Sequence, residues 1–417
     1  MSFLYSLFTF LQPGILFPAL APYKPLLLLS LLALVSTLVK SPDYSRKLVF
    51  SNSALRYLIG FVLVQIISVY YSGFYSMFQY FLFWYAYIAF IIVSVLLISS
   101  IKEIQRYILG MILAGEFIVG YGIYAVIYHL PSSIEGRAGA YGMYENHNDY
   151  TFMIIQILPF VYMMRFRTQN GFYRLLLNIM LLSQIAGVVY SQSRGGMVAL
   201  VVELGLLYVN TTKARIGIFK ILLMGSIAVG AVAFQIIHRD EEQGPQYTTA
   251  DAEGSRFELW KAGKNMFFTH PLLGVGSLRF GEFSQDYAEI SHDNRGKNAH
   301  NTYVEILATT GLVGWICFFG FIKTSIKQLR QMIKDNKENT VGTYALATLI
   351  AFYSILVRAL FDTKTYDWSF YTLCVIAVSL YAYYSNQKLR KTTQENLSQD
   401  GQETEQTGTL NQSGSRL

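Results

Sequence analysis

Charged side chains are scarce in this sequence. Asp, Glu, Lys and Arg make up 14% of the 417 residues, whereas soluble globular domains carry about 25%. Hydrophobic residues reach 53% and gather in long runs separated by basic residues. Because about 20 apolar residues in a helix span the hydrocarbon core, the composition excludes an ordinary soluble domain. It predicts an all-α polytopic membrane protein, and the short alternating strands of a membrane β-barrel are missing.

Cysteines and cofactor motifs are also few. Cys317 and Cys374 both lie inside apolar runs, so we expect packing residues rather than a disulfide. The sequence has no HExxH pattern, no paired DxD on an outer loop, no Cys/His cluster and no Walker loop. It therefore predicts no metal, no cofactor and no use of ATP. We attribute the net charge of +7 to membrane topology rather than to a nucleic-acid partner.

The apolar runs predict twelve transmembrane helices. Several are short, and polar residues facing the bundle can extend them. The predicted spans are roughly 4–21, 25–40, 55–72, 79–99, 107–128, 150–164, 175–190, 197–210, 217–237, 300–322, 341–360 and 367–385.

Basic residues mark alternate loops. The loop after the tenth span alone carries five, and the short odd-numbered loops offer only Lys24, Arg137, Arg194 and Lys364. The positive-inside rule then places the even-numbered loops and both termini in the cytoplasm. By the same parity, the long polar loop before the tenth span lies on the opposite side of the membrane, in a periplasm or its equivalent.

These patterns divide the chain into four parts. The long loop contains a helix-like stretch, Ser255–Phe268, and a turn, His270–Gly276, so we expect a folded cap. The C-terminal tail, residues 386–417, has few apolar side chains to bury and is predicted to be disordered. The parts are spans one to nine at 1–237, the large periplasmic loop at 238–299, spans ten to twelve at 300–385, and a disordered cytoplasmic tail at 386–417.

Polar residues gather on the predicted outer side. Taken alone, each has an ordinary explanation: Arg194 can snorkel to the interface, and Arg256 can pair with Glu253 or Glu258. Together, several guanidinium groups suit a phosphate or diphosphate, and a neutral histidine can accept a proton from a hydroxyl. The set is Arg137, His147, Asn148, Arg194, Arg256 and His300, with Asn301 and Glu305 following His300.

Four motifs in this order resemble a known family. They are "ENHND" at 145–149, "SRGG" at 193–196, "SRFELW" at 255–260 followed by "PLLGVG" at 271–276, and "HNTYVEILATTGLVG" at 300–314. With the topology, they resemble the O-antigen ligase and O-antigen polymerase superfamily of bacterial inner-membrane glycosyltransferases. The resemblance implies a GT-C-like fold and transfer of a glycan from undecaprenyl diphosphate to an acceptor hydroxyl at the periplasmic face.

The resemblance also implies roles for individual residues. His300 matches the catalytic base, and Arg194 and Arg256 match arginines that hold the diphosphate in place of a metal. Arg137 is our own addition to the diphosphate site, from topology and charge. Supporting roles fall to His147, Asn148, Asn301, which can orient a sugar or the imidazole, and Glu305, which can hydrogen-bond His300 and fix its tautomer. Attack opposite the diphosphate would invert the anomeric centre.

Three functions remain open from the sequence. A ligase would use lipid A–core as acceptor, and a polymerase another lipid-linked repeat unit; the single long loop favours the ligase. A transporter of lipid-linked glycans is the third, since Glu116 and Glu203 lie within apolar runs and intramembrane carboxyl groups often mark transport pathways. No internal repeat supports the transporter.

Overall fold

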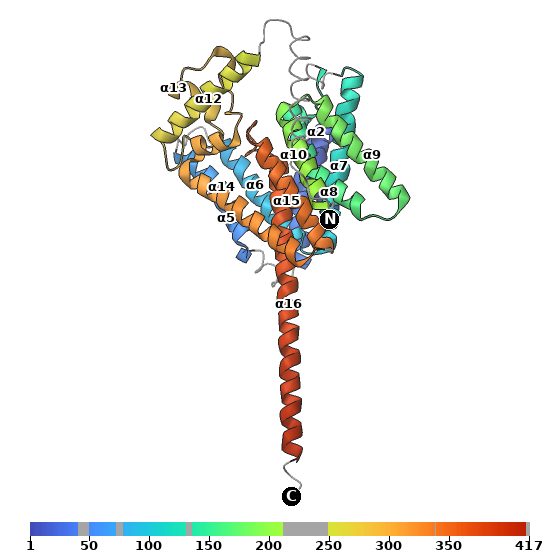
Figure 1. Cartoon of the computed structure of the whole chain (residues 1–417). Helices are drawn as coiled ribbons and strands as arrows, with labels where there is room; N and C mark the ends of the chain where they lie inside the picture. Colours follow the sequence, from blue (N-terminus) through green and yellow to red (C-terminus); the bar gives the residue numbers. More distant parts are fainter. Residues whose placement is uncertain (41–49, 72–77, 131–135, 212–248, 338, 414–417) are drawn as a thin grey trace.

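The computed structural model describes residues 1–40, 50–71, 78–130, 136–211, 249–337 and 339–413. All regular elements within these ranges are helices (Figure 1), as expected where lipid leaves the backbone no other hydrogen-bond partners. They are α1 (Ser2–Leu11), α2 (Pro13–Leu16), η1 (Pro18–Tyr23), α3 (Pro25–Lys40), α5 (Ser53–Tyr71), α6 (Phe78–Leu97), α7 (Ile101–Ile127), η3 (Gly142–Tyr144), α8 (His147–Arg167), α9 (Gly171–Tyr190), α10 (Arg194–Thr211), α12 (Thr249–Thr269), α13 (Phe280–Tyr287), η4 (His292–Asn294), α14 (Thr302–Asp335), α15 (Thr340–Arg358) and α16 (Trp368–Ser413).

The predicted spans coincide with these helices, apart from the first and the ninth. The first, 4–21, is broken: α1 ends before Gln12, which is left-handed (φ 47°), and α2 starts at Pro13. Proline lacks the N–H that would continue the helix. The ninth span, 217–237, lies outside the described residues.

Six described helical segments are long and apolar enough to cross a membrane. α8 is not among them, yet its residues from Tyr150 to Val161 are all buried. A helix buried on every side faces protein instead of lipid. The six are Pro18–Thr37, Ser53–Tyr71, Ile101–Ile127, Gly171–Tyr190, Thr302–Asp335 and Thr340–Arg358.

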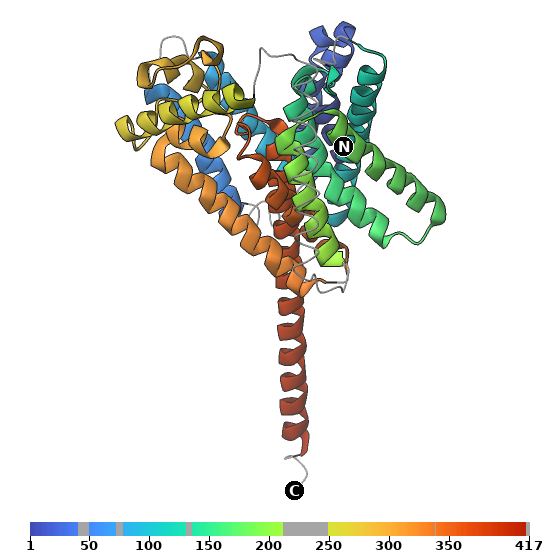
Figure 2. The same ribbon diagram turned by 45° about the horizontal axis from the view of Figure 1, so that its top comes forward.

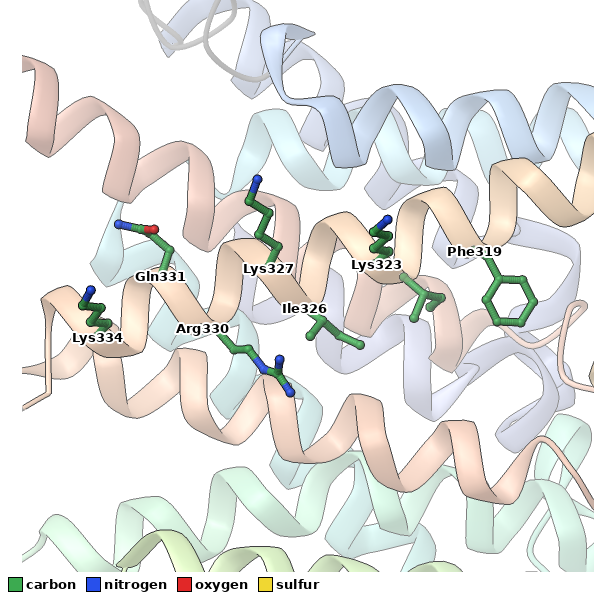
Figure 3. A pocket seen from close by; sticks show the side chains of 8 residues that line it. Phe319, Lys323, Ile326, Lys327, Arg330, Gln331 and Lys334 are labelled. Atoms are coloured by element: carbon green, nitrogen blue, oxygen red, sulfur yellow. The ribbon is translucent and has the colours of Figure 1, made fainter.

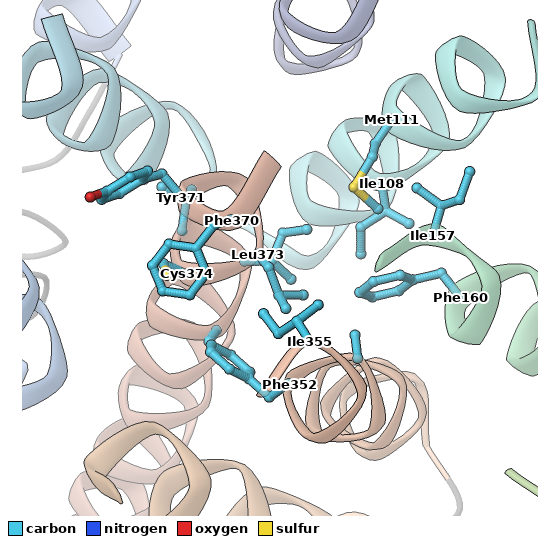
Figure 4. Close-up of a cluster of buried hydrophobic side chains, with 14 of the residues drawn as sticks. Ile108, Met111, Ile157, Phe160, Phe352, Ile355, Phe370, Tyr371, Leu373 and Cys374 are labelled. Carbon is cyan, nitrogen blue, oxygen red and sulfur yellow. The ribbon is translucent and has the colours of Figure 1, made fainter. Parts of the chain in front are cut away.

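The core is built around α8, which packs against α7, α9, α10 and α15. Figure 4 shows apolar side chains from α7, α8, α15 and α16 meeting there. This packing places the first turns of α8 and α10 beside the end of α15. The labelled core residues are Ile108, Met111, Ile157, Phe160, Phe352, Ile355, Phe370, Tyr371, Leu373 and Cys374.

The described part of the long loop, 249–299, folds as a cap with its own apolar cluster. It contains α12, α13 and η4 and lies at one end of the bundle, above the start of α14 (Figure 1). The helix and the turn predicted within the loop are both present. The cluster comprises Leu259, Met266, Val275, Phe280 and Ala299 of the cap with Ala308 of α14.

The C-terminal tail departs from the predicted disorder. α16 continues as a helix to Ser413 and extends beyond the other helices at the end opposite to the cap (Figure 2). Lys, Gln and Glu, which are common there, are good helix formers. Because the apolar part of α16 is already helical, the tail adds to an existing helix without a new nucleus.

Candidate active site

His300 immediately precedes α14. Its backbone is left-handed (φ 48°), which is uncommon for a residue with a side chain. Asn301 follows as the N-cap: its Oδ1 accepts hydrogen bonds from the N–H groups of Tyr303 (3.0 Å) and Val304 (3.2 Å). These contacts hold the imidazole at the helix mouth, where 35% of its side chain is exposed. The Asn301 oxygen is therefore used by the backbone, which leaves it less suited to orient a sugar.

Asp362, in the loop between α15 and α16, faces this imidazole. His300 Nδ1 lies 3.6 Å from Asp362 Oδ1, which also accepts a hydrogen bond from the Thr363 N–H at 2.9 Å. Lys364 Nζ lies 2.8 Å from Oδ2. Burial alone would raise the pKa of Asp362, but the charge of Lys364, helped by His300 and Arg358, holds that pKa well below its usual range. Asp362 is therefore a carboxylate at neutral pH.

Two buried cations fix the position of Asp362. The side chains of Arg358 and Lys364 are 1% and 3% exposed. Arg358 Nη2 lies 3.4 Å from Asp362 Oδ2 and 3.4 Å from the carbonyl oxygen of Asn148. Lys364 also contacts the Asp149 carboxylate directly. Burial would lower the pKa of Lys364, but Asp362 and Asp149 raise it above its usual value. This ion network joins the loop after α15 to the first turn of α8.

A side-chain hydrogen bond joins the starts of α8 and α10. The Ser193 hydroxyl donates to Asn148 Oδ1 at 2.8 Å, and its oxygen accepts the N–H of Gly196 at 3.2 Å, which caps α10. Gly195 lies against Arg358, where a Cβ would come within 2.8 Å of Nη1. Two helix N-termini, each carrying a partial positive charge, thus lie beside the ion network.

Arg194 and Arg256 border this region. Arg194 is the first residue of α10 and is partly exposed. Arg256, also partly exposed, lies on α12, close enough to Arg358 for their charges to repel. His147 is partly exposed at the first position of α8. The guanidinium groups of Arg194, Arg256 and Arg358 and the imidazole of His300 therefore belong to elements that meet at this end of the bundle.

Arg137 has a different environment from the one expected of a diphosphate ligand. It is buried, and its Nε and Nη2 donate to the carbonyl oxygens of Ser191 (3.1 Å) and Gln192 (3.1 Å). These carbonyls lie at the end of α9, where the helix leaves backbone acceptors unpaired. The structure thus gives Arg137 a role in holding the turn that leads to Arg194.

Glu305 does not make the predicted hydrogen bond to His300. Its Oε2 accepts the N–H of Ala299 at 2.8 Å and the Thr363 hydroxyl at 3.4 Å, and its Oε1 accepts the Tyr366 hydroxyl at 2.9 Å. The fully buried carboxyl group therefore joins the residue before His300 to the loop that carries Asp362. The side chain that faces the imidazole is that of Asp362.

The "PLLGVG" motif (271–276) forms backbone hydrogen bonds with α14 on both sides of a break in that helix. Gly311 has φ 60° and ψ −160° and interrupts the helix. The Leu312 N–H donates to the Pro271 carbonyl at 2.8 Å, and the Val275 N–H donates to the Ala308 carbonyl at 2.9 Å. A Cβ on Gly274 would come within 2.3 Å of the Thr309 carbonyl carbon. Two motifs far apart in the sequence therefore form one unit that fixes the cap against α14.

Residues 179–319 match a family model described as O-antigen ligase. The matched segment runs from α9 through the cap into α14 and contains Arg194, Arg256, His300 and Gly311. This match, which covers about a third of the chain, supports a relation to the O-antigen ligase superfamily. A search of curated proteins found no match to the chain.

Members of the O-antigen ligase superfamily are membrane glycosyltransferases, and the apolar helices agree with a multi-pass membrane enzyme of this class. Asp362 and Lys364 lie beyond the matched segment, and the sequence interpretation gave them no role. A signal was present: "DTKTYDW" at 362–368 is a charged loop between two apolar runs, on the same predicted side as His300.

The two intramembrane glutamates differ in their surroundings. The Glu116 carboxyl group, on α7, accepts a hydrogen bond from the Ser183 hydroxyl of α9 at 2.8 Å and another from the Gln184 amide. Glu203, on α10, is fully buried. The contacts of Glu116 are those of a group that joins two helices inside the bundle.

Proposed function

We propose that the chain is an O-antigen ligase-type glycosyltransferase. It transfers a glycan from undecaprenyl diphosphate to a hydroxyl of lipid A–core at the periplasmic face of the inner membrane. The reaction inverts the anomeric centre and needs no metal. The observation that carries the proposal is the pairing of His300 with Asp362, 3.6 Å apart, at the mouth of a helix long enough to cross the membrane.

In this proposal His300 is the general base. Its Nδ1 faces Asp362, so Nε2 is the nitrogen that takes the proton from the acceptor hydroxyl. As the proton leaves, the hydroxyl oxygen bonds to the anomeric carbon, and the bond from that carbon to the diphosphate oxygen breaks. The charge of Asp362 stabilises the imidazolium that forms. One displacement gives one inversion.

Arg194 and Arg256 bind the diphosphate and stabilise the negative charge that it gains on leaving. Both are partly exposed, so a ligand can reach them. The N-terminus of α10, where Arg194 stands, adds backbone N–H groups that favour an anion. These groups supply the positive charge that a divalent cation would supply in other enzymes. Arg137 supports Arg194 indirectly through the turn after α9.

The membrane arrangement follows the same logic. Both substrates are anchored in lipid, so their reacting atoms are held at the membrane surface. A base at the start of α14, beneath a folded cap, suits that depth. We propose twelve spans with both termini in the cytoplasm, divided at 237/238 and 299/300 by the periplasmic loop. The agreement between predicted spans and described helices supports this topology.

Reconstituted transfer tests the proposal. The full-length protein in detergent would receive an undecaprenyl-diphosphate glycan, lipid A–core and EDTA, without ATP, and products would be separated on a gel. Glycan on lipid A–core is the expected result. Lengthening of the lipid-linked glycan with no product on lipid A–core would replace the ligase by a polymerase. Neither product, from folded protein and a verified donor, would overturn the transferase proposal and favour the transporter.

A further inference from the structure

A groove runs along α14 near the end of the helix remote from His300 (Figure 3). Its volume is about 640 Å³. It combines apolar and cationic side chains, and no Asp or Glu is among the residues that line it. The lining residues are Phe319, Ile322, Lys323, Ile326, Lys327, Arg330, Gln331 and Lys334.

The groove changes character along its length. Phe319, Ile322 and Ile326 give its apolar part, and the cations begin at Lys323 and continue toward Lys334. After the break at Gly311, α14 runs without interruption to Asp335, a length of roughly 36 Å, whereas the hydrocarbon core is about 30 Å thick. α14 therefore extends past the hydrocarbon. The change from apolar to cationic falls where a membrane changes from acyl chains to headgroups.

The lysines of the groove are available to a ligand. Lys323, Lys327 and Lys334 are exposed, and within the described residues none of their ammonium groups has a hydrogen bond or an ion pair. Arg330 is already held: its Nη2 donates to the Tyr353 hydroxyl at 2.7 Å, and its guanidinium lies 5.9 Å from that ring's centroid.

One carboxylate lies beside the groove. Asp335 follows Lys334 on α14, accepts hydrogen bonds from Gln331 at 3.1 Å and from the Tyr384 hydroxyl, and its charge interacts with that of Lys334. The three lysines outnumber this carboxylate, so the face keeps a net positive charge that attracts an outside anion.

We propose that this groove binds an anionic phospholipid from the leaflet opposite to the one that His300 faces. The lipid phosphate lies among Lys323, Lys327 and Lys334, and an acyl chain follows Phe319, Ile322 and Ile326 toward the middle of the membrane. Charge complementarity distinguishes this lipid from the surrounding zwitterionic ones. In the topology proposed above, the leaflet is the cytoplasmic one. This lipid site is separate from the proposed site of glycosyl transfer, and its test does not depend on whether the protein transfers glycan.

Native mass spectrometry of the full-length protein tests the site. Protein would be equilibrated with micelles containing equal amounts of phosphatidylglycerol and phosphatidylethanolamine, and retained lipid would be counted. The wild type should retain phosphatidylglycerol preferentially. Each lysine changed to Gln should weaken that retention about fivefold, so the triple variant Lys323→Gln, Lys327→Gln, Lys334→Gln should lose roughly 100-fold.

The control removes the same charge elsewhere. Lys102, Arg174 and Lys337 are exposed residues on the same predicted side, and changing all three to Gln should leave retention as in the wild type. If the groove triple does not fold, the single variants Lys327→Gln and Lys334→Gln give the same test at about fivefold each. Equal retention by the groove variants and the control would overturn the site, as would equal retention of the two lipids by the wild type.

Discussion

His300 Nδ1 and Asp362 Oδ1 lie 3.6 Å apart, although the two residues come from different sides of α15 in the sequence. The contact exists because the Thr302 hydroxyl, just after His300, donates to the Asp362 carbonyl at 2.7 Å, and the Thr302 N–H donates to the Ala359 carbonyl at 2.9 Å. The start of α14 and the loop after α15 are therefore fixed to each other by hydrogen bonds from Thr302 to two backbone carbonyls. This is the geometry on which the proposed base depends.

The first prediction concerns the carboxylate. Asp362→Asn keeps the size of the side chain but removes the charge that stabilises a protonated His300. We expect the transfer rate to fall by roughly 10²–10⁴-fold. The comparison is Asp293→Asn, an exposed carboxyl in the cap with 75% side-chain exposure, which should transfer glycan at the wild-type rate. A wild-type rate for Asp362→Asn would show that the pairing has no part in transfer.

The second prediction concerns stability and pH. The pKa of Asp362 is lowered, so its stabilisation is present above its unfolded pKa and is lost only as pH falls through the depressed folded value. The pKa of Lys364 is raised, so its stabilisation is lost only as pH rises through the elevated value. Asp362→Asn should destabilise the fold by roughly 3–5 kcal/mol, because Lys364 and Arg358 lose a buried partner.

The unfolding midpoint in detergent measures this effect. The wild type should stay more stable than Asp362→Asn throughout the range from about pH 5 to about pH 9. A difference that disappears within this range would mean that one of the two groups titrates there, and the assignment of a permanently charged pair would be wrong.

The fold was largely predictable because membrane helices are long apolar runs with basic flanks. The candidate site was predictable only in part. His300, Arg194 and Arg256 stand in local motifs, but the contact between His300 and Asp362 joins residues 62 positions apart and depends on how α14 packs on α15. Arg137 shows a second limit. The sequence places Arg137 in an outer loop, but it does not show whether the guanidinium faces a ligand or the carbonyls at the end of α9.

The third prediction distinguishes the role of Arg137 from that of Arg194. Arg137→Gln should lower the free energy of unfolding by roughly 1–3 kcal/mol, because two carbonyls at the end of α9 lose a charged donor. Arg194→Gln should leave that free energy nearly unchanged and lower kcat/KM for the lipid-linked donor. Unfolding curves and donor titrations of the two variants measure this. The opposite pattern would make Arg137 the diphosphate ligand.

The fourth prediction concerns the junction between cap and α14. A Cβ on Gly311 would come within 2.4 Å of the Leu272 carbonyl group, and its φ of 60° disfavours a side chain. Gly311→Ala should therefore destabilise the protein by roughly 1–3 kcal/mol or more and make the cap more sensitive to limited proteolysis. Gly120→Ala is the control, since nothing lies within 4 Å of its added Cβ. That change inside α7 should be neutral or slightly stabilising. Equal behaviour of the two variants would count against the junction.

The most direct measurement is glycan transfer by His300→Ala beside His292→Ala, in EDTA and without ATP, with protein abundance and unfolding midpoint checked for both. The His292 side chain is 90% exposed and has no part in the proposed site. The proposed base predicts that His292→Ala transfers glycan at the wild-type rate while His300→Ala, equally abundant and folded, transfers none. Normal transfer by His300→Ala would contradict the central claim that His300 is the general base.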